Sequence, residues 1–191
     1  MIARRTCLAG LAACVLPVAR PAAPAVPDAF AAALAAPSTH VILRHARAPG
    51  TGDPPGLRLG DCSTQRNLDN RGRAQARRLG DALRATGAPF DAVLTSQWCR
   101  CRDTATLLAL GPVTAEPVLN SFFAGRGDRT AQTRALRDLL RGAADRRLVL
   151  VTHQVNITAL TGSGVASGEA FAIRMGAADR AEVLARVLPP A

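Results

Sequence analysis

Two short apolar segments that lie far apart in the chain both end in a histidine, and this repetition constrains the fold more than any other feature. Residues 40–45 read HVILRH, and residues 146–153 read RRLVLVTH. Apolar runs of this length predict buried strands, as in parallel sheets. Because functional groups gather at the carboxyl ends of such strands, His45 and His153 are expected at the same edge of the sheet.

Helical patterns alternate with strand-like segments along the rest of the chain. We expect a linker or short helix at 28–37, helices at 68–87, 99–111 and 130–143, and a short helix after residue 153. Strands are expected at 40–45, 90–96 and 146–153, and an extended piece at 113–119. A last hairpin is expected at 169–175 and 181–188. This alternation indicates an α/β fold. With 191 residues, 48% of them hydrophobic, the chain is expected to form a single-domain three-layer α/β/α sandwich with a mostly parallel sheet.

Residues 1–27 have the order of an export signal, in which charged residues precede an apolar stretch and then small residues with prolines. The apolar stretch is too short to cross a bilayer. The segment is interpreted as a signal peptide or as a lipoprotein leader, whose LAAC sequence would place a lipid on Cys14. Residues 28–191 are therefore expected to form the folded domain of a periplasmic or otherwise exported protein, and that lipid would be its only contact with a membrane.

The charge balance is strongly basic. The chain has 24 arginines, no lysine and 14 acidic residues, which gives a formal charge of +10. Such an excess favours anionic partners, and phosphate groups are among them. Nucleic acid is not expected as a partner, because tyrosine is absent and only 3% of residues are aromatic, so few side chains could stack on bases.

Three cysteines lie beyond the predicted leader. In an exported domain they allow one disulfide and one free thiol, with Cys62 joined to either Cys99 or Cys101. The chain has no pair of cysteines with the spacing of a structural zinc site, so no metal is expected.

Polar and charged residues follow three of the predicted strands. Arg44 and His45 end the first strand, the segment from Ser96 to Arg100 follows the second, and His153 ends the fourth. Arginine offers phosphate a planar fork of donors, whereas a neutral imidazole can attack phosphorus and carry the phosphoryl group. We therefore expect Arg44 and Arg100 to hold the phosphoryl oxygens, His45 to be the nucleophile and His153 to donate to the transition state. Neither a metal nor a cofactor is needed for this arrangement.

The same segments resemble motifs of the histidine phosphatase superfamily, which is also called phosphoglycerate mutase-like. LRHARAPG (43–50) is similar to its Arg-His-Gly opening, TSQWCRCRDTA (95–105) to its Ser-x-x-x-Arg-x-x-x-Thr-Ala segment, and VTHQVNI (151–157) to the end of its second histidine strand. RNLDNRGRAQARRLG (66–80) resembles the helix that follows the first loop. The resemblance implies the phosphoglycerate mutase-like fold. It is greatest to exported bacterial members, including the phosphatase that acts on heptose phosphate in lipopolysaccharide core, which implies an envelope sugar phosphate or another phosphorylated small molecule as substrate.

The chain departs from this family where its mutases carry a glutamate as general acid, since Ser121 occupies that position. Asp128, Glu169 and Glu116 are the carboxylates that could replace the glutamate, and spacing alone does not choose among them. Without an acid, hydrolysis would depend steeply on the leaving group. Thr51 and Gln65 in the long loop at 46–67 are weaker candidates for binding substrate, whereas His40 precedes the first strand and is expected at the surface.

These observations predict an exported, metal-independent phosphatase that hydrolyses phosphomonoesters through a phosphohistidine. Two alternatives remain open at this point. An exported module could bind anions without turnover, although binding alone would not require two histidines. A phosphoryl mutase would need a phosphorylated cofactor and is disfavoured by the missing glutamate.

Overall fold

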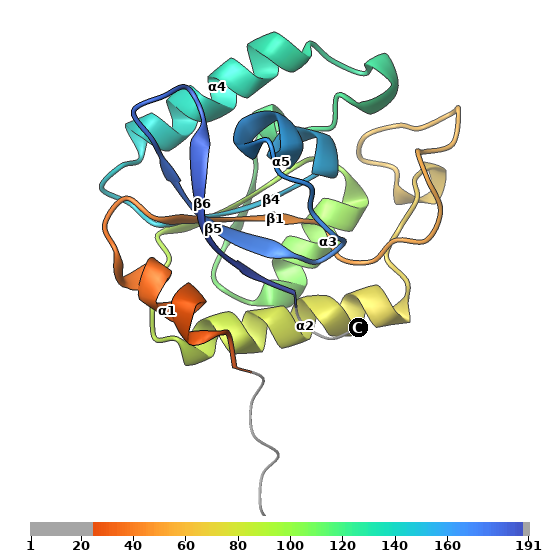
Figure 1. Cartoon of the computed structure of the whole chain (residues 1–191). Helices are drawn as coiled ribbons and strands as arrows, with labels where there is room; N and C mark the ends of the chain where they lie inside the picture. The colour runs from red at the N-terminus through yellow and green to blue at the C-terminus, as the bar shows by residue number, and fades with distance from the viewer. Residues whose placement is uncertain (1–24, 189–191) are drawn as a thin grey trace, which may run out of the picture.

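The computed structural model describes residues 25–188 and contains a six-stranded sheet covered by helices on both faces (Figure 1). The helices are α1 (Asp28–Ala35), α2 (Asn70–Ala85), α3 (Cys99–Leu108), α4 (Arg129–Gly142) and α5 (Gln154–Thr161). The strands are β1 (His40–Arg44), β2 (Ala92–Thr95), β3 (Val113–Ala115), β4 (Leu148–Thr152), β5 (Ala170–Met175) and β6 (Ala181–Val187). Short 3-10 turns occupy η1 (Cys62–Thr64), η2 (Pro117–Leu119) and η3 (Phe123–Gly125). The predicted α/β fold is confirmed, whereas almost all of the predicted leader, including Cys14, lies outside the described residues.

The sheet is mixed, so the prediction of a mostly parallel sheet holds only in part. Its strand order is β3-β2-β4-β1-β5-β6. Strands β1 to β4 pair in parallel, but β5 runs antiparallel to both β1 and β6. Strands β5 and β6 are antiparallel to each other because they form a hairpin. Strand β5 of this hairpin pairs with the edge of β1 that β4 leaves free.

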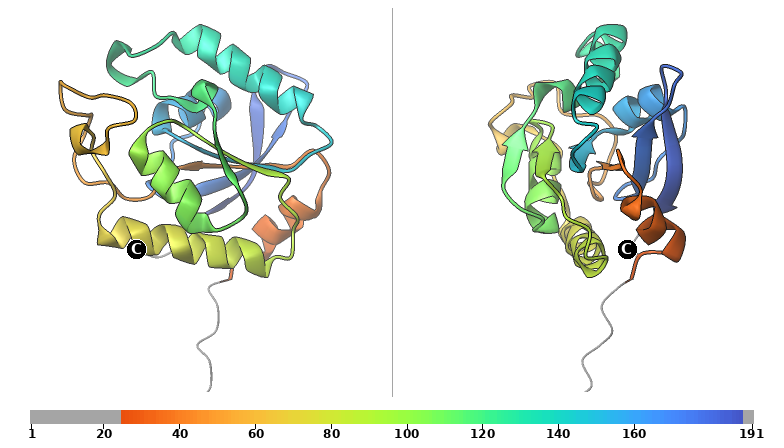
Figure 2. Two further views of the ribbon diagram at one scale, coloured as in Figure 1. Left: turned by 180° about the vertical axis from the view of Figure 1, so that it is seen from behind. Right: turned by 90° about the vertical axis from the view of Figure 1, so that its left-hand side faces the viewer.

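Two apolar cores lie on opposite faces of the sheet, which gives the molecule its three layers (Figure 2). Helices α1, α2 and α3 cover one face, and α4 and α5 cover the other. The alternation of side chains along β1 shows why this strand is apolar throughout. Val41 and Leu43 enter the first core, whereas Ile42 enters the second.

The parallel pairing of β1 with β4 brings the two predicted histidines together. Arg44 lies opposite Thr152 in the register, and the backbone N–H of His45 donates to the Thr152 carbonyl at 3.0 Å. His153 follows directly on β4 and precedes the first turn of α5. Both imidazoles therefore leave the sheet at the same edge, as the sequence predicts.

His40, which was expected at the surface, lies in the interior with 1% of its surface exposed. It is the first residue of β1, and its Nδ1 accepts a hydrogen bond from the backbone N–H of Leu148 at 3.3 Å. Burial lowers the pKa of His40, so the ring is neutral and fits an apolar setting. The prediction was wrong because the sheet extends one residue further than the apolar run.

No helix among residues 25–188 is both long and apolar enough to cross a membrane.

Close packing between α2 and α3 predicts that Gly80→Ala destabilises the protein by about 1–3 kcal/mol, as overpacking does in a close-packed interior. A Cβ at Gly80 would overlap the backbone carbonyl of Leu108, which has no room to move. Gly142→Ala is the matched control, since a Cβ at this helical glycine meets nothing within 4 Å. This control is expected to be neutral or stabilising by up to about 1 kcal/mol. Chemical denaturation measures the free energy of unfolding of both variants, and equal stability of the two would contradict the packing argument.

Candidate active site

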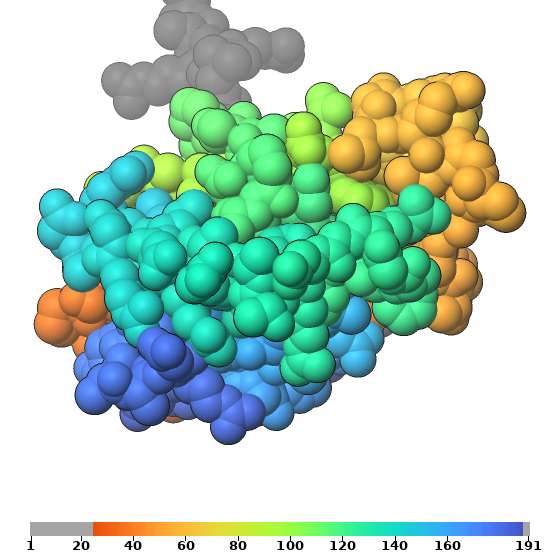
Figure 3. Space-filling view, turned by 90° about the horizontal axis from the view of Figure 1, so that it is seen from above, coloured from red at the N-terminus to blue at the C-terminus, as the bar shows by residue number. Residues whose placement is uncertain are grey.

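A cavity of about 510 Å³ opens at the carboxyl ends of β1 and β4. It is lined by all four residues predicted to act on phosphate, namely Arg44, His45, Arg100 and His153, and also by Thr51. Other walls come from the loop at 46–67, the segment at 121–129 and the start of α5. Figure 3 shows that loop and that segment side by side at one end of the molecule.

His45 is held in the form required of a nucleophile. Its Nδ1 lies 2.8 Å from the carbonyl oxygen of Ala46, which only accepts hydrogen bonds, so Nδ1 carries the proton and Nε2 keeps its lone pair. The ring is 2% exposed. Burial first, and the charge of Arg100 second, lower the pKa of His45 to about 3, which keeps the imidazole neutral at ordinary pH.

His153 packs against the same cavity, with its ring 5.6 Å from that of His45. Its Nε2 lies 2.9 Å from the hydroxyl oxygen of Ser96, and its Nδ1 lies 3.5 Å from Nη2 of Arg100. Because a guanidinium only donates, Nδ1 faces it as an acceptor and Nε2–H donates to Ser96. Burial first, followed by the interactions with His45 and with the charge of Arg100, lowers the pKa of His153 well below its ordinary value.

Arg100 makes a buried ion pair with Asp53, a residue that sequence analysis missed. Nη1 and Nη2 donate to the two carboxylate oxygens at 2.6 and 3.0 Å, and the side chains are 4% and 6% exposed. Trp98 Nε1 also donates to this carboxylate, at 3.1 Å. A planar guanidinium matches a carboxylate in this way, so the position of Asp53 is closely tied to that of Arg100.

Arg66 is a third arginine of the cavity, and it too was missed. Its Nε donates to the carbonyl of Gly52 at 2.8 Å, and its Nη1 donates to the carbonyl of Ala48. Arg66 therefore holds the loop that carries Asp53. Both residues lie in a stretch without hydrophobic periodicity, where the only signal in the sequence was the unusual length of the loop between His45 and α2.

Two of the arginines that line the cavity have an unpaired guanidinium N–H group. Within the described part of the chain, Nε of Arg44 and Nε of Arg100 are buried and have no hydrogen-bond partner. Burial, and then the charge of Arg100, lower the pKa of Arg44, although an arginine keeps its proton. Unpaired buried donors beside excess positive charge indicate a site for a tetrahedral oxyanion.

The other predicted residues lie around or outside this cavity. Gln65 is a structural residue, because its amide contacts the backbone of Arg58 and Cys99. Asp128 and Glu116 accept hydrogen bonds from backbone N–H groups in the helical turns that follow them, and Glu169 accepts one from Ala166. None of these three carboxylates lines the cavity. Ser121 does line it.

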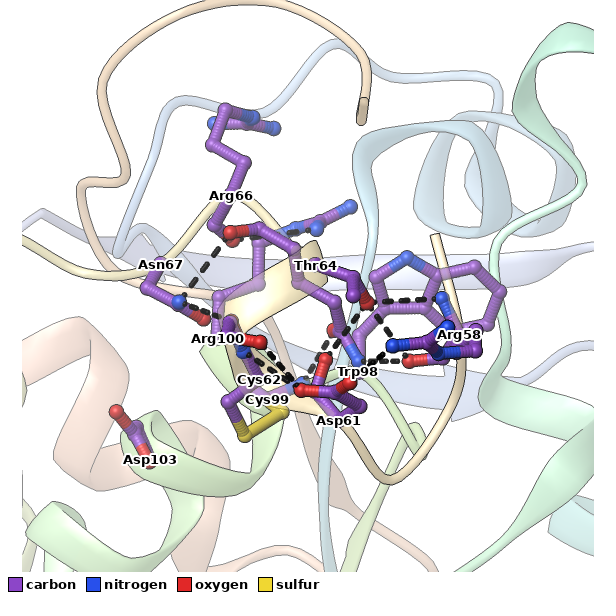
Figure 4. Close-up of a disulfide and its surroundings, with 12 residues drawn as sticks. Arg58, Asp61, Cys62, Thr64, Arg66, Asn67, Trp98, Cys99, Arg100 and Asp103 are labelled. Carbon is purple, nitrogen blue, oxygen red and sulfur yellow. Dashed lines mark hydrogen bonds and ion pairs between the residues drawn. A yellow bond between two sulfur atoms is a disulfide. The ribbon is translucent and has the colours of Figure 1, made fainter. Parts of the chain in front are cut away.

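A disulfide joins Cys62 to Cys99, which is one of the two pairings left open by the sequence (Figure 4). It fastens the loop at 46–67 to the first turn of α3, next to Arg100. Cys101 is free and buried, and burial raises the pKa of its thiol to about 12. The disulfide therefore attaches the two segments that carry Asp53 and its arginine partner.

No cluster of three or more histidine, cysteine, aspartate or glutamate side chains suited to a metal ion occurs among residues 25–188.

A neutral imidazole with a free Nε2, surrounded by arginines at the carboxyl edge of an α/β sheet, defines a class of phosphoryl-transfer sites. The sequence profile described as "Histidine phosphatase superfamily (branch 1)" matches residues 41–131. Residues 41–131 thus match the family whose motifs the chain resembles.

Solved structures of similar proteins have the same fold. The protein histidine phosphatase SixA in complex with tungstate is 16% identical, with 79% of this chain and 97% of that chain covered and a TM-score of 0.58. A mycobacterial glucosyl-3-phosphoglycerate phosphatase is 19% identical, with 76% of this chain and 96% of that chain covered and a TM-score of 0.55. A putative alpha-ribazole-5'-P phosphatase from Escherichia coli is 20% identical, with 80% of this chain and 96% of that chain covered and a TM-score of 0.57. Among curated protein sequences, none matches this chain significantly.

The three histidines of the chain predict a loss of stability in mild acid. Each has a pKa lowered by burial, so the unfolded chain takes up protons below pH 6.5 while the folded protein does not. Stability should therefore fall as the pH decreases from 6.5 to 5, by about 1.4 kcal/mol per pH unit for each ring that stays neutral. Urea denaturation across this range measures the slope, and His40→Gln should reduce it. A flat profile would contradict the neutral state of the rings.

Proposed function

We propose that this protein is a phosphatase that hydrolyses phosphomonoesters through a phosphohistidine on His45. The observation that carries the proposal is the hydrogen bond from Nδ1 of His45 to the carbonyl of Ala46, which leaves Nε2 unprotonated beside three arginines. A module that only binds anions does not need an imidazole fixed in its nucleophilic form, so turnover is favoured over binding alone.

The reaction begins when the phosphoryl group enters the cavity. The free Nε–H groups of Arg44 and Arg100 donate to its oxygens and neutralise part of its charge. Nε2 of His45 then attacks phosphorus, the bond from phosphorus to the ester oxygen breaks, and the phosphoryl group is held on the ring. Water next attacks phosphorus and releases inorganic phosphate, which restores the neutral imidazole.

His153 stabilises the charge that develops during transfer. Its Nε2 forms a hydrogen bond with Ser96, and its Nδ1 lies beside Arg100, which lines the cavity. Its pKa is low, because burial and the neighbouring arginines oppose a further charge. A bound phosphoryl dianion reverses this balance, so Nδ1 of His153 takes up a proton from solvent and the resulting N–H donates a hydrogen bond to a phosphoryl oxygen.

The substrate class is a phosphorylated small molecule. The cavity extends beyond the phosphate site along Phe123, Arg126 and Arg129, which would contact the rest of the substrate. Similar structures include a glucosyl-3-phosphoglycerate phosphatase and a putative alpha-ribazole-5'-P phosphatase. For this chain we propose an envelope sugar phosphate of the heptose phosphate type, on the basis of the resemblance to exported bacterial members of the family.

Export is part of the proposal. The order of charged, apolar and small residues in 1–27 is typical of a secreted protein, and either a cleaved signal peptide or a lipid on Cys14 would follow from it. The disulfide between Cys62 and Cys99 supports an oxidising compartment such as the periplasm.

The mutase alternative is less favoured. A mutase must return the phosphoryl group to a bound intermediate, and the family's mutases use a glutamate where this chain has Ser121. A serine hydroxyl is a poor proton donor, so reversible transfer between two alcohols lacks its acid at that position.

His45→Ala should abolish phosphatase turnover while the protein stays folded, because the cavity holds no second nucleophile in the required form. His153→Ala should keep some activity, with kcat reduced on the order of 10²- to 10³-fold, as expected for loss of one donor to the transition state. The rate of p-nitrophenyl phosphate hydrolysis measures the activity of both variants, and circular dichroism checks that each is folded. Activity of His45→Ala within tenfold of the parent would refute the assignment.

Activity should not depend on a metal ion, because arginines supply the charge neutralisation that Mg²⁺ or Zn²⁺ provides in other phosphoryl-transfer sites. The measurement is turnover of p-nitrophenyl phosphate before and after treatment with EDTA. Equal rates are expected. Loss of activity that is restored by adding back a divalent metal would contradict metal independence.

A further inference from the structure

A carboxylate that could replace the missing general acid lines the cavity from a different segment. We propose that Asp53, from the loop at 46–67, protonates the leaving oxygen when the phosphoryl group moves to His45. Among the described residues that line the cavity, Asp53 is the only carboxylate. The inference rests on the proposed phosphatase function and names a further catalytic residue for it.

Asp53 is held in place from several directions. Trp98 Nε1 donates to Oδ2 at 3.1 Å, and the backbone N–H of Arg66 points to Oδ1 at 3.4 Å. Next to Asp53, the carbonyl of Gly52 accepts a hydrogen bond from the side chain of Arg66. The disulfide from Cys62 attaches the same loop to α3 (Figure 4). A loop residue that is fixed in this way can act with the precision that proton transfer requires.

The geometry of Arg100 places the carboxylate beside the phosphoryl site. Nη1 and Nη2 at the end of the guanidinium hold Asp53, whereas Nε at its side is buried and unpartnered. A guanidinium can therefore hold the carboxylate on one edge and a phosphoryl oxygen on the next edge. The two anions then lie next to each other in the same cavity, so the carboxylate need not leave when substrate binds.

Substrate binding also favours the protonated form of Asp53, which takes up its proton from solvent. In the protein without ligand, burial raises the pKa of Asp53, but hydrogen bonds and the charge of Arg100 outweigh burial and lower it. A phosphoryl dianion repels the carboxylate and competes for Arg100, and both effects favour the protonated acid. The other groups that face Asp53 are the guanidinium of Arg66 and the thiol of Cys101, which stays un-ionised.

The two steps balance in atoms and charge. In the first step, Nε2 of His45 bonds to phosphorus, the ester bond breaks, and the carboxyl proton of Asp53 passes to the leaving oxygen, which departs as an alcohol. In the second step, the Asp53 carboxylate takes a proton from water as the water oxygen bonds to phosphorus and the bond from nitrogen to phosphorus breaks. The sum is one ester and one water converted to one alcohol and one phosphate.

The rival explanation is that Asp53 only positions Arg100. The two roles differ in how they depend on the substrate. A residue that positions Arg100 affects every phosphate ester alike, since each one binds the same guanidinium. An acid is needed for an alkyl ester, whose alkoxide is a poor leaving group, and hardly at all for p-nitrophenyl phosphate, whose phenolate leaves without a proton.

The test compares Asp53→Asn with the parent on a primary alkyl phosphate and on p-nitrophenyl phosphate. Asp61→Asn is the matched control, because Asp61 is an exposed carboxylate of the same loop that pairs with Arg58 outside the cavity. Asp53→Asn should lose on the order of 10²- to 10⁴-fold in kcat for the alkyl ester and less than about tenfold for the aryl ester. Asp61→Asn should leave kcat unchanged for both esters. Equal losses on both substrates, or no loss on either, would overturn the proposal.

A pH profile of the parent enzyme keeps the test decisive if Asp53→Asn fails to fold. With Asp53 as acid, kcat/KM for the alkyl ester falls as pH rises and the carboxyl loses its proton, whereas the aryl ester shows no such fall. Profiles of the same shape for both esters would refute the role of Asp53. Turnover of the aryl ester through His45 tests the phosphatase proposal separately, so the two can fail independently.

Discussion

The chemistry of this site follows from the positive charge that arginines bring into one cavity at the carboxyl edge of the sheet. Arg44, Arg66 and Arg100 line the same space, and Asp53 is the one carboxylate that faces them there among the described residues. Buried cations without enough partners are costly. Two guanidinium N–H groups of these three arginines are unpaired, and a phosphoryl group is the kind of anion that would satisfy them.

The same positive charge sets the state of the histidines. Burial, together with the neighbouring arginines, keeps His45 and His153 neutral, and the proposed role of His45 as nucleophile requires this neutral form. The carbonyl of Ala46 then determines which ring nitrogen of His45 keeps its lone pair. The state of this imidazole is therefore a consequence of where β1 ends and of which charges surround that point.

Topology brings these groups to one place, and the antiparallel hairpin does not disturb them. Strands β1 and β4 lie side by side in parallel, so their histidines share an edge. The turn before β5 contacts the end of β1, since the backbone N–H of Gly168 donates to the carbonyl of His45 at 3.1 Å. A mixed sheet thus serves the site as well as a fully parallel sheet would.

Residues within regular elements could be predicted from the sequence, whereas residues within the long loop could not. The helix expected at 68–87 extends from Asn70 to Ala85, because its apolar positions recur with a helical period and Asp69 caps its start. Asp53 and Arg66 belong to a segment whose course is set by a disulfide and by side-chain contacts to the backbone, and these leave no periodic trace in a sequence. His40 was mistaken for a surface residue because the burial of a strand's first residue depends on its neighbours in the sheet.

The most direct test of this account is to identify the residue that carries the phosphoryl group. The purified protein is mixed with a phosphate ester, quenched in alkali within milliseconds to preserve phosphohistidine, digested and mapped by mass spectrometry. The account predicts one phosphoryl group on the peptide that contains His45, and none in His45→Ala. A phosphoryl group on another residue, or turnover with no phosphorylated intermediate, would contradict it.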